Sequence, residues 1–148
     1  MQVIPYMAAA VIVGAMIAAQ PPLNAILARS VGSAYAATAI SIFIALCCAL
    51  AILLLTGGGR ITPTTLLAVP WWVYLAGVVG AVFVGSGVVI APVTGALVFF
   101  VCVVAGQLLG SMVMDHFGAF GLEVREVSWA RGLGISLVVA GAILVGKG

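Results

Sequence analysis

Five long apolar segments dominate this chain, and each has a length that suits a membrane-spanning helix. They cover residues 3–27, 34–55, 71–90, 92–114 and 129–145. About 20 predominantly apolar residues are needed to cross the hydrocarbon core of a bilayer, which is roughly 30 Å thick. The charged residues lie outside these segments or at their ends, apart from Arg131 just inside the fifth. We therefore expect an all-α integral membrane protein with about five transmembrane helices.

The composition supports this interpretation, because a water-soluble fold could not hide so much apolar surface. Hydrophobic residues make up 66% of the 148 residues, charged residues make up 5%, and the mean hydropathy is +1.42. In a soluble domain, about a quarter of the residues are charged. The longest connections, residues 56–70 and 115–128, are too short for a soluble domain, and the N-terminus lacks the basic residues of a secretory signal. We expect a single transmembrane domain over residues 1–148, with the first segment kept as a span.

Enzyme, metal and nucleic-acid functions find little support in the sequence. The chain has one histidine, no spacing typical of metal ligands, and no serine or cysteine near a recognisable base. The three cysteines, Cys47, Cys48 and Cys102, fall within spans, where packing is the expected role. A net charge of +2 is too small to indicate nucleic-acid binding. We expect no catalysis, no cofactor, no metal and no nucleic-acid partner.

Prolines and amides interrupt the last third of the first span. Gln20 and Asn24 are four residues apart and so share one face of a helix, while Pro21 and Pro22 remove backbone donors. Irregular backbone in a membrane is tolerated where it is buried in protein or lines a watery cavity, and transporters place substrate sites at such breaks. Gln20 and Asn24 are therefore candidate substrate-binding residues. The alternative is that their amides only satisfy the carbonyl groups that the prolines release.

Gln107 is a further candidate substrate-binding residue, because an amide inside the fourth span is costly unless it has a partner or a purpose. Trp71 and Trp72, which follow Pro70 at the start of the third span, are also candidates. Their indole rings could form an aromatic wall that binds a cationic group. The alternative is an interfacial belt, since tryptophan favours the boundary between membrane and water.

Asp115 and His116 mark the point at which the chain leaves the membrane after the fourth span. Because histidine changes its charge near neutral pH, this pair could couple transport to protons. The alternative is a helix terminus in which Asp115 pairs with an arginine, either Arg131 or Arg125, and Gly118 allows the chain to turn. No acidic residue lies deep in a span, so the sequence does not favour exchange of a cation for protons at a buried carboxylate.

Small residues and one short connection indicate how the helices pack. The third and fourth spans are joined through Ala91 and Pro92, and we expect Pro92 to open the fourth span, where its missing N–H costs little. These two spans should then form a tight antiparallel hairpin. Small residues four apart let helix backbones approach closely. Such packing faces are expected at Ala10, Gly14 and Ala18, at Gly106 and Gly110, and at Thr38, Ser41, Ala45 and Cys48. The alternative for the glycine-containing faces is contact with a ligand.

The motifs occur in the order typical of one known family. They are the segment from Gln20 to Arg29, Pro70-Trp71-Trp72 before Gly77 and Gly80, Ala91-Pro92 with Gly95-Ala96, Gly106-Gln107, Asp115-His116-Phe117-Gly118, and Arg131-Gly132 with Gly141. Over nearly its whole length the chain resembles the YdcZ family of the drug/metabolite transporter superfamily. One departure is the double proline Pro21-Pro22, where a single proline is expected, and we expect it to sharpen the break in the first span.

The resemblance implies a multi-pass protein of the bacterial inner membrane with a role in transport. Larger members of the superfamily resemble two inverted halves of five spans each. The chain is therefore expected to supply half of an inverted-repeat transporter and to assemble as a dimer, with an antiparallel copy of itself or with a related five-span chain. Membrane lipid and a small-molecule solute are the other expected partners.

Positive charges leave the orientation of the chain open. On one side lie Arg60, Arg125 and Arg131 with the N-terminus, and on the other lie Arg29 and Lys147. Lysines and arginines in short loops normally set the orientation, and this difference is close to no bias. The chain could favour a cytoplasmic N-terminus weakly, or its copies could insert both ways.

The depths of two amides favour pairing of inverted copies. With the expected bounds, Gln20 and Gln107 each lie about two-thirds along helices of opposite direction, so about 10 Å separates their depths within one copy. In an inverted second copy, Gln20 would come level with Gln107 of the first. The sequence thus predicts a transporter for a neutral or zwitterionic small molecule that works by alternating access. The alternative is a non-transporting accessory or assembly protein that binds another membrane protein.

Overall fold

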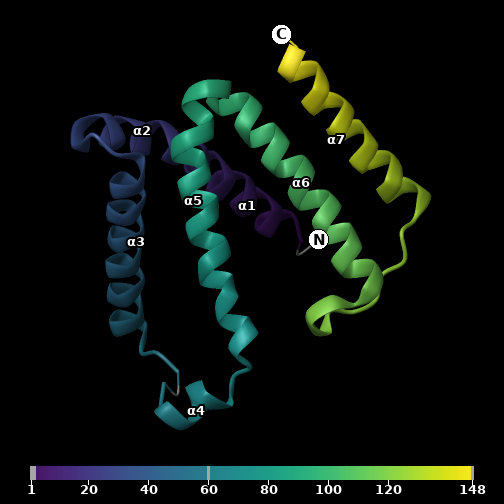
Figure 1. Cartoon of the computed structure of the whole chain (residues 1–148). Helices are drawn as coiled ribbons and strands as arrows, with labels where there is room; N and C mark the ends of the chain where they lie inside the picture. The colour runs from purple at the N-terminus through teal and green to yellow at the C-terminus, as the bar shows by residue number, and fades with distance from the viewer. Residues whose placement is uncertain (1–2, 60, 148) are drawn as a thin grey trace. The chain divides into compact units, whose positions relative to one another are not determined.

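The computed structural model describes residues 3–59 and 61–147, in which every regular element is helical (Figure 1). In chain order these are α1 (Val3–Ala18), α2 (Gln20–Val31), α3 (Ala34–Thr56), α4 (Pro63–Ala68), the 3₁₀ helix η1 (Trp71–Tyr74), α5 (Leu75–Thr94), α6 (Ala96–Phe117), the 3₁₀ helix η2 (Ala119–Gly121) and α7 (Trp129–Lys147). Arg60, which entered the charge count, lies outside the described residues.

Five helical stretches of the described chain are long and apolar enough to cross a membrane. They are Ile4–Val31, Ala34–Thr56, Trp71–Thr94, Ala96–Phe117 and Trp129–Lys147. The expected all-α architecture with five spans is confirmed, and each span ends one to four residues later than the sequence indicated. The helices continue to the next residue that can stop them, which for each of the first four spans is a glycine.

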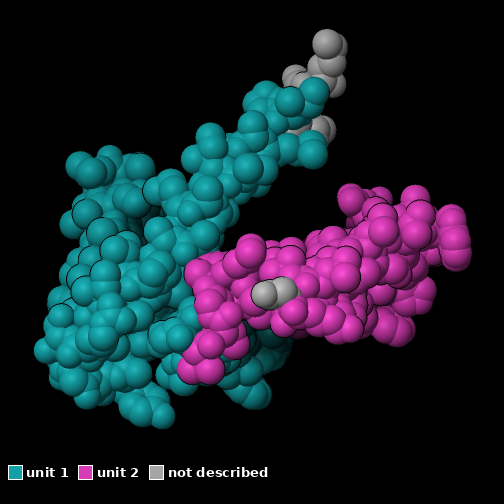
Figure 2. Space-filling view, turned by 90° about the horizontal axis from the view of Figure 1, so that it is seen from above, with its two compact units in different colours: residues 1–92 teal, residues 93–148 magenta. Residues whose placement is uncertain are grey.

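Contacts within the chain group it into two compact units, residues 1–92 and residues 93–148, coloured teal and magenta in Figure 2. Unit 1 holds the elements from α1 to α5, except the last two residues of α5. Unit 2 holds α6, η2 and α7. The single domain expected from the sequence is not tested by this grouping and stays a prediction.

The first span of unit 1 breaks at Ala19 into α1 and α2. Pro21 and Pro22 lie in the first turn of α2, where a missing N–H leaves no helical hydrogen bond unmade. At the other end of α2, Gly32 adopts a left-handed conformation with φ 73°, which a glycine reaches without steric cost. The N–H of Ser33 then donates to the carbonyl of Ala28 at 3.1 Å, which closes the helix.

The turn between α2 and α3 is held by Ser33, whose backbone is extended before α3 begins. Its hydroxyl accepts a hydrogen bond from the N–H of Ala36 at 3.2 Å, as is usual for a residue that caps a helix N-terminus. Because this connection is so short, α2 and α3 pack directly against each other. The start of α3 therefore lies close to the end of α2.

Small side chains form the buried part of unit 1. They come from three helices: Pro21, Asn24 and Ala25 of α2, Ala37 of α3, and Gly87, Val88 and Ala91 of α5. The members from α2 follow the spacing of one helical face, so α2 presents a single narrow face to its neighbours. Such small residues let helix backbones approach closely in a membrane.

The connection between the third and fourth spans lies later than expected. Pro92 does not open the fourth span but lies inside α5, which continues to Thr94. The break is at Gly95, with φ 82° and ψ 150°, a conformation that is essentially restricted to glycine. The sequence expectation was wrong because a proline two residues before the end of a helix disturbs only its last turn, whereas Gly95 can leave the helix altogether. The antiparallel hairpin of these two spans stays a prediction.

In unit 2, the chain turns back after α6 through Gly118, which is left-handed with φ 59°. The loop then returns to the helix end, where the N–H of Arg125 donates to the carbonyl of Asp115 at 2.9 Å. A Cβ at position 118 would lie 2.7 Å from Cγ2 of Val124, so only glycine fits there. The expected role of Gly118 in the turn is confirmed, and α7 packs along α6.

Candidate functional site

Asn24 of α2 is a buried polar side chain in unit 1, with 7% of its surface exposed. Its amide makes no hydrogen bond or ion pair with any described residue. The described residues contain no fully buried polar side-chain atom that lacks a partner. The amide of Asn24 must therefore keep a small opening to solvent, through which a hydrogen-bonding group could reach it.

Gln20, one turn earlier, is half-buried and shares the face of α2 that carries Asn24. Its side chain likewise makes no hydrogen bond among the described residues. The alternative raised by the sequence was that these amides bond to the carbonyls that the prolines release. Pro21 and Pro22 cannot donate to residues 17 and 18, four positions earlier, yet neither amide fills that role in the structure. Both amides stay available to a ligand.

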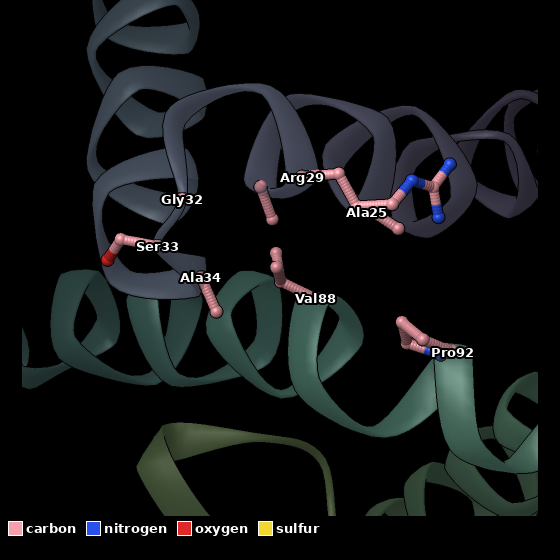
Figure 3. Close-up of a pocket in the computed structure, with 8 residues that line it drawn as sticks. Ala25, Arg29, Gly32, Ser33, Ala34, Val88 and Pro92 are labelled. Atoms are coloured by element: carbon pink, nitrogen blue, oxygen red, sulfur yellow. The ribbon is translucent and has the colours of Figure 1, made fainter.

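A cavity of about 420 Å³ lies beside this face, between α2, the start of α3 and α5 (Figure 3). Its lining consists of Ala25, Ala28, Arg29, Gly32, Ser33, Ala34, Val88 and Pro92. Small-molecule pockets are mostly apolar with a few polar groups, and this cavity has that character. Asn24 itself is not among the lining residues, but the next residue, Ala25, is.

Arg29 is the charged residue of this cavity, and the sequence assigned it only a part in the topology count. Figure 3 shows its guanidinium group extended along α2 toward Ala25, whereas the hydroxyl of Ser33 points away. The signal that could have found Arg29 is its spacing, because it lies four residues after Ala25 and thus on the same side of α2, although its side chain is exposed. Its guanidinium adds a positive charge to a wall of small apolar groups.

Gln107 lies in unit 2, near the middle of α6, and its side chain is exposed. It makes no hydrogen bond among the described residues. The neighbouring glycines of the expected packing face, Gly106 and Gly110, have no atom within 4 Å of the position that a Cβ would take. The same holds for Gly14 of α1. These faces are open within their own units, so their role in packing stays a prediction.

Trp71 and Trp72 lie in η1, with 75% and 44% of their surfaces exposed. Neither indole lines the cavity beside α2. The nearby Tyr74 donates a hydrogen bond from its hydroxyl to the carbonyl of Leu66 at 2.8 Å, which ties η1 to α4. The structure thus brings the two tryptophans to the surface of unit 1 and not to Asn24.

At the end of α6, Asp115 and His116 have different surroundings. Asp115 is half-buried and lines a second cavity, of about 340 Å³, together with Arg125 and Arg131. His116 is exposed, and its ring meets the ring of Phe117 edge-on with 5.0 Å between centroids. Of the two residues that could couple transport to protons, Asp115 therefore lines a cavity, whereas His116 lies on the surface.

The ion pair expected between Asp115 and an arginine is not formed among the described residues. Arg125 instead pairs with Glu123 at 3.2 Å, and both side chains are largely exposed. Arg125 does reach Asp115, but through its backbone N–H. At the start of α7, the backbone N–H of Arg131 donates to the hydroxyl of Ser128 at 3.3 Å. Among residues 3–59 and 61–147, no group of three or more His, Cys, Asp or Glu side chains is placed to hold a metal ion.

Comparison with known proteins agrees with the arrangement of spans and motifs. The family described as "Putative inner membrane exporter, YdcZ" matches residues 5–144. The "Inner membrane protein YdcZ" of Escherichia coli K12 is 31% identical over 80 residues, which cover 54% of this chain and 53% of that protein. The chain thus matches about half the length of this curated relative. No solved structure matches.

An exporter is a transporter and not an enzyme, so the family description agrees with a transport role. The family match reaches from the first span to the fifth, and the structure supplies five helices able to cross a membrane. The chain belongs to the YdcZ family, and it is a multi-pass protein of the inner membrane.

Proposed function

We propose that this chain is half of a small-molecule exporter that works by alternating access in an antiparallel dimer. Its solute is neutral or zwitterionic, and the amides of Asn24 and Gln20 bind it. The observation that carries this proposal is Asn24, which is buried in unit 1 without a hydrogen-bond partner among the described residues.

The small opening beside Asn24 lets solvent satisfy its amide when no solute is bound. A molecule that closes this opening must replace those hydrogen bonds, because leaving the amide unsatisfied would cost about 1–3 kcal/mol. A solute that enters from the opening beside Asn24 could supply the missing hydrogen bonds. The charge of Arg29 in the neighbouring cavity would favour the anionic end of a zwitterion.

The position of the break also supports a substrate site. The first span runs over Ile4–Val31, so Gln20 lies about three residues, or ~4 Å along a helix, past its centre. Secondary transporters place their sites near the middle of the membrane, at helices that are interrupted there. The α1–α2 junction at Ala19 has this position: its backbone stays helical, with φ −77° and ψ −19°, but the two prolines that follow cannot donate hydrogen bonds to the end of α1.

The observed bounds change the argument for an inverted partner. Gln107 lies within about one residue of the centre of its own span, Ala96–Phe117, so the expected depth difference of about 10 Å from Gln20 shrinks to a few ångström. Depth alone no longer requires inversion to bring the two amides level. The antiparallel dimer now rests on the half-transporter architecture that the family resemblance implies.

Access to position 24 can be tested without knowing the solute. Asn24→Cys is introduced into a chain in which Cys47, Cys48 and Cys102 are replaced by alanine, and the purified protein is placed in liposomes. A membrane-impermeant maleimide is added to the outside only. The variant Lys147→Cys, at the end of the fifth span, reports which fraction of the copies faces each way.

Alternating access predicts that Asn24→Cys is labelled to completion from one side, because every copy exposes it to that side in turn. The labelled share of Asn24→Cys copies should exceed the share of Lys147→Cys copies that is labelled. It should also exceed the share of Lys147→Cys copies that stays unlabelled. Labelling limited to either fraction would mean a site open to one side only, and no labelling would mean a sealed structural amide. Either result contradicts the proposal.

Flux measurements separate the exporter from an accessory protein. Liposomes with wild-type protein are loaded with radiolabelled neutral and zwitterionic solutes, and efflux is compared with that of Asn24→Leu, Gln20→Ala and Gln107→Ala. We expect efflux of at least one solute, reduced tenfold or more in Asn24→Leu, whereas Leu23→Ala, an exposed neighbour, serves as the control. Folded variants that all transport at the wild-type rate would remove the proposed site. A folded wild-type protein with no flux would favour the accessory role.

A further inference from the structure

The second cavity, of about 340 Å³, lies within unit 2 between α6 and α7 and has two chemically different ends. Asp115, Arg125 and Arg131 line it where α6 ends and α7 begins. Leu108 and Val138 line it about 10 Å further along the two helices, given a rise of 1.5 Å per residue. The cavity is therefore charged at the membrane boundary and apolar toward the membrane interior.

The charged end holds opposite charges that do not join each other. The carboxylate of Asp115 and the guanidinium of Arg131 line the same space, yet neither side chain makes an ion pair or hydrogen bond among the described residues. Arg125 is engaged by Glu123. The groups left to a ligand are thus one carboxylate and one guanidinium, which suit a molecule with one ammonium and one anionic group.

The direction of this polarity identifies the kind of ligand. A phospholipid in a leaflet has its charged head at the boundary and its acyl chains toward the interior, and the cavity follows the same order. Phosphate is recognised well by the planar, multi-donor guanidinium of arginine. An ammonium group would be attracted to Asp115, whereas a lipid with only negative charge would be repelled by that carboxylate.

We propose that this cavity binds a zwitterionic phospholipid with a primary ammonium head, as in phosphatidylethanolamine. The phosphate lies at Arg131, and the ammonium lies at Asp115. The part of an acyl chain that is nearest the head group lies along Leu108 and Val138. The site consists of residues of unit 2, whereas Asn24 belongs to unit 1, and it does not depend on the proposed transport function.

Native mass spectrometry of the full chain in detergent tests this site, with dioleoyl phosphatidylethanolamine and dioleoyl phosphatidylglycerol as probes. We expect wild-type protein to bind the ethanolamine lipid on the order of tenfold more tightly than the glycerol lipid. Asp115→Asn should remove this preference, because the repulsion of the anionic lipid and the attraction of the ammonium are both lost. Arg131→Gln should weaken binding of both lipids about tenfold.

Two matched controls carry the same chemical changes outside the cavity. Glu126→Gln replaces a carboxylate of the same loop, and Lys147→Gln removes a positive charge in the last turn of α7, outside the cavity lining. Both should leave the lipid preference unchanged. Gly134→Leu keeps every charge but adds a side chain to the apolar wall, where no atom lies within 4 Å of a Cβ. It should weaken binding of both lipids, and it keeps the test valid if a charge variant does not fold.

Several results would overturn the proposal. Equal binding of the two lipids by wild-type protein would show that Asp115 does not select the head group. An unchanged preference in folded Asp115→Asn protein would have the same meaning. Displacement of the lipid by an equal concentration of soluble glycerophosphoethanolamine would show that the site recognises a water-soluble zwitterion and not a lipid.

Discussion

Gly85 of α5 faces Thr38 of α3 so closely that a Cβ at position 85 would lie 3.5 Å from Cγ2 of Thr38. The hydroxyl of Thr38 donates to the carbonyl of Ala34 at 2.9 Å, which keeps its methyl group turned toward α5. The polar stripe of the second span was expected to pack, and for Thr38 this is confirmed. The distance leaves room for one methyl group between the two helices and for little more.

The effect of a substitution at Gly85 on the free energy of unfolding should therefore depend on the size of the new side chain. Alanine makes ordinary van der Waals contact with Thr38 and favours the helix. The free energy of unfolding of Gly85→Ala should therefore be within about 1 kcal/mol of the wild-type value or higher. Gly85→Leu should lower the free energy of unfolding by about 1–3 kcal/mol, because its side chain forces α3 and α5 apart. Unfolding in detergent with increasing dodecyl sulfate measures both. Gly80→Leu, on α5 where a Cβ meets nothing, is the control, and an equal loss there would contradict the packing argument.

The break at Gly95 predicts a second contrast between two glycines. Gly95 has φ 82° and ψ 150°, so Gly95→Ala should cost about 1–3 kcal/mol of backbone strain. Gly110 lies inside α6 with open space around it, so Gly110→Ala should be neutral or stabilising by up to about 1 kcal/mol. Thermal unfolding of the purified variants would measure the difference. If Gly95→Ala were as stable as Gly110→Ala, the chain would have to leave α5 in another conformation.

His116 should not couple transport to protons, because it lies on the surface of the helix end with its ring against Phe117, outside the cavity that Asp115 lines. His116→Gln should leave the pH dependence of access to position 24 unchanged between pH 6 and pH 8. The measurement is the labelling rate of Asn24→Cys, divided at each pH by that of Lys147→Cys to remove the reactivity of the thiol itself. A pH profile that flattens in His116→Gln would show that the histidine does take part.

The two termini should be found on both sides of the membrane, as antiparallel pairing of identical copies requires. Reporters that are active on only one side, fused to either end, should both give signals. Two lysines added after Lys147 should shift the population toward copies with a cytoplasmic C-terminus, following the positive-inside tendency. A single orientation for wild-type chains would instead favour a parallel assembly or a separate five-span partner.

Some parts of the fold could be predicted because they depend on composition alone. The five spans follow from run length, and the turn at Gly118 follows from the need for a left-handed residue after α6. The place of the connection after the third span could not be predicted, since Pro92 and Gly95 both suit a helix boundary. The structure selects Gly95, because a helix can contain a proline in its last turn but cannot continue through φ 82°.

The candidate site shows the same division. The sequence pointed to Gln20 and Asn24 from their spacing beside two prolines, but it could not say whether their amides had partners. It passed over Arg29, whose place in a cavity depends on how α5 lies beside α2. It also expected an ion pair for Asp115, whereas the described residues form none: Arg125 reaches Asp115 through its backbone N–H, and its guanidinium pairs with Glu123.

The sequence by itself determined that this chain is a five-span membrane protein of the YdcZ family, because lipid demands long apolar helices and the order of motifs is local information. Tertiary structure decided which polar groups are satisfied. Asn24 is buried without a partner among the described residues, and Asp115 and Arg131 line one cavity without joining, because α2 packs against α3, and α7 packs along α6. Hydrogen bonding and burial depend on which helices meet, and that is set by packing between segments far apart in the chain.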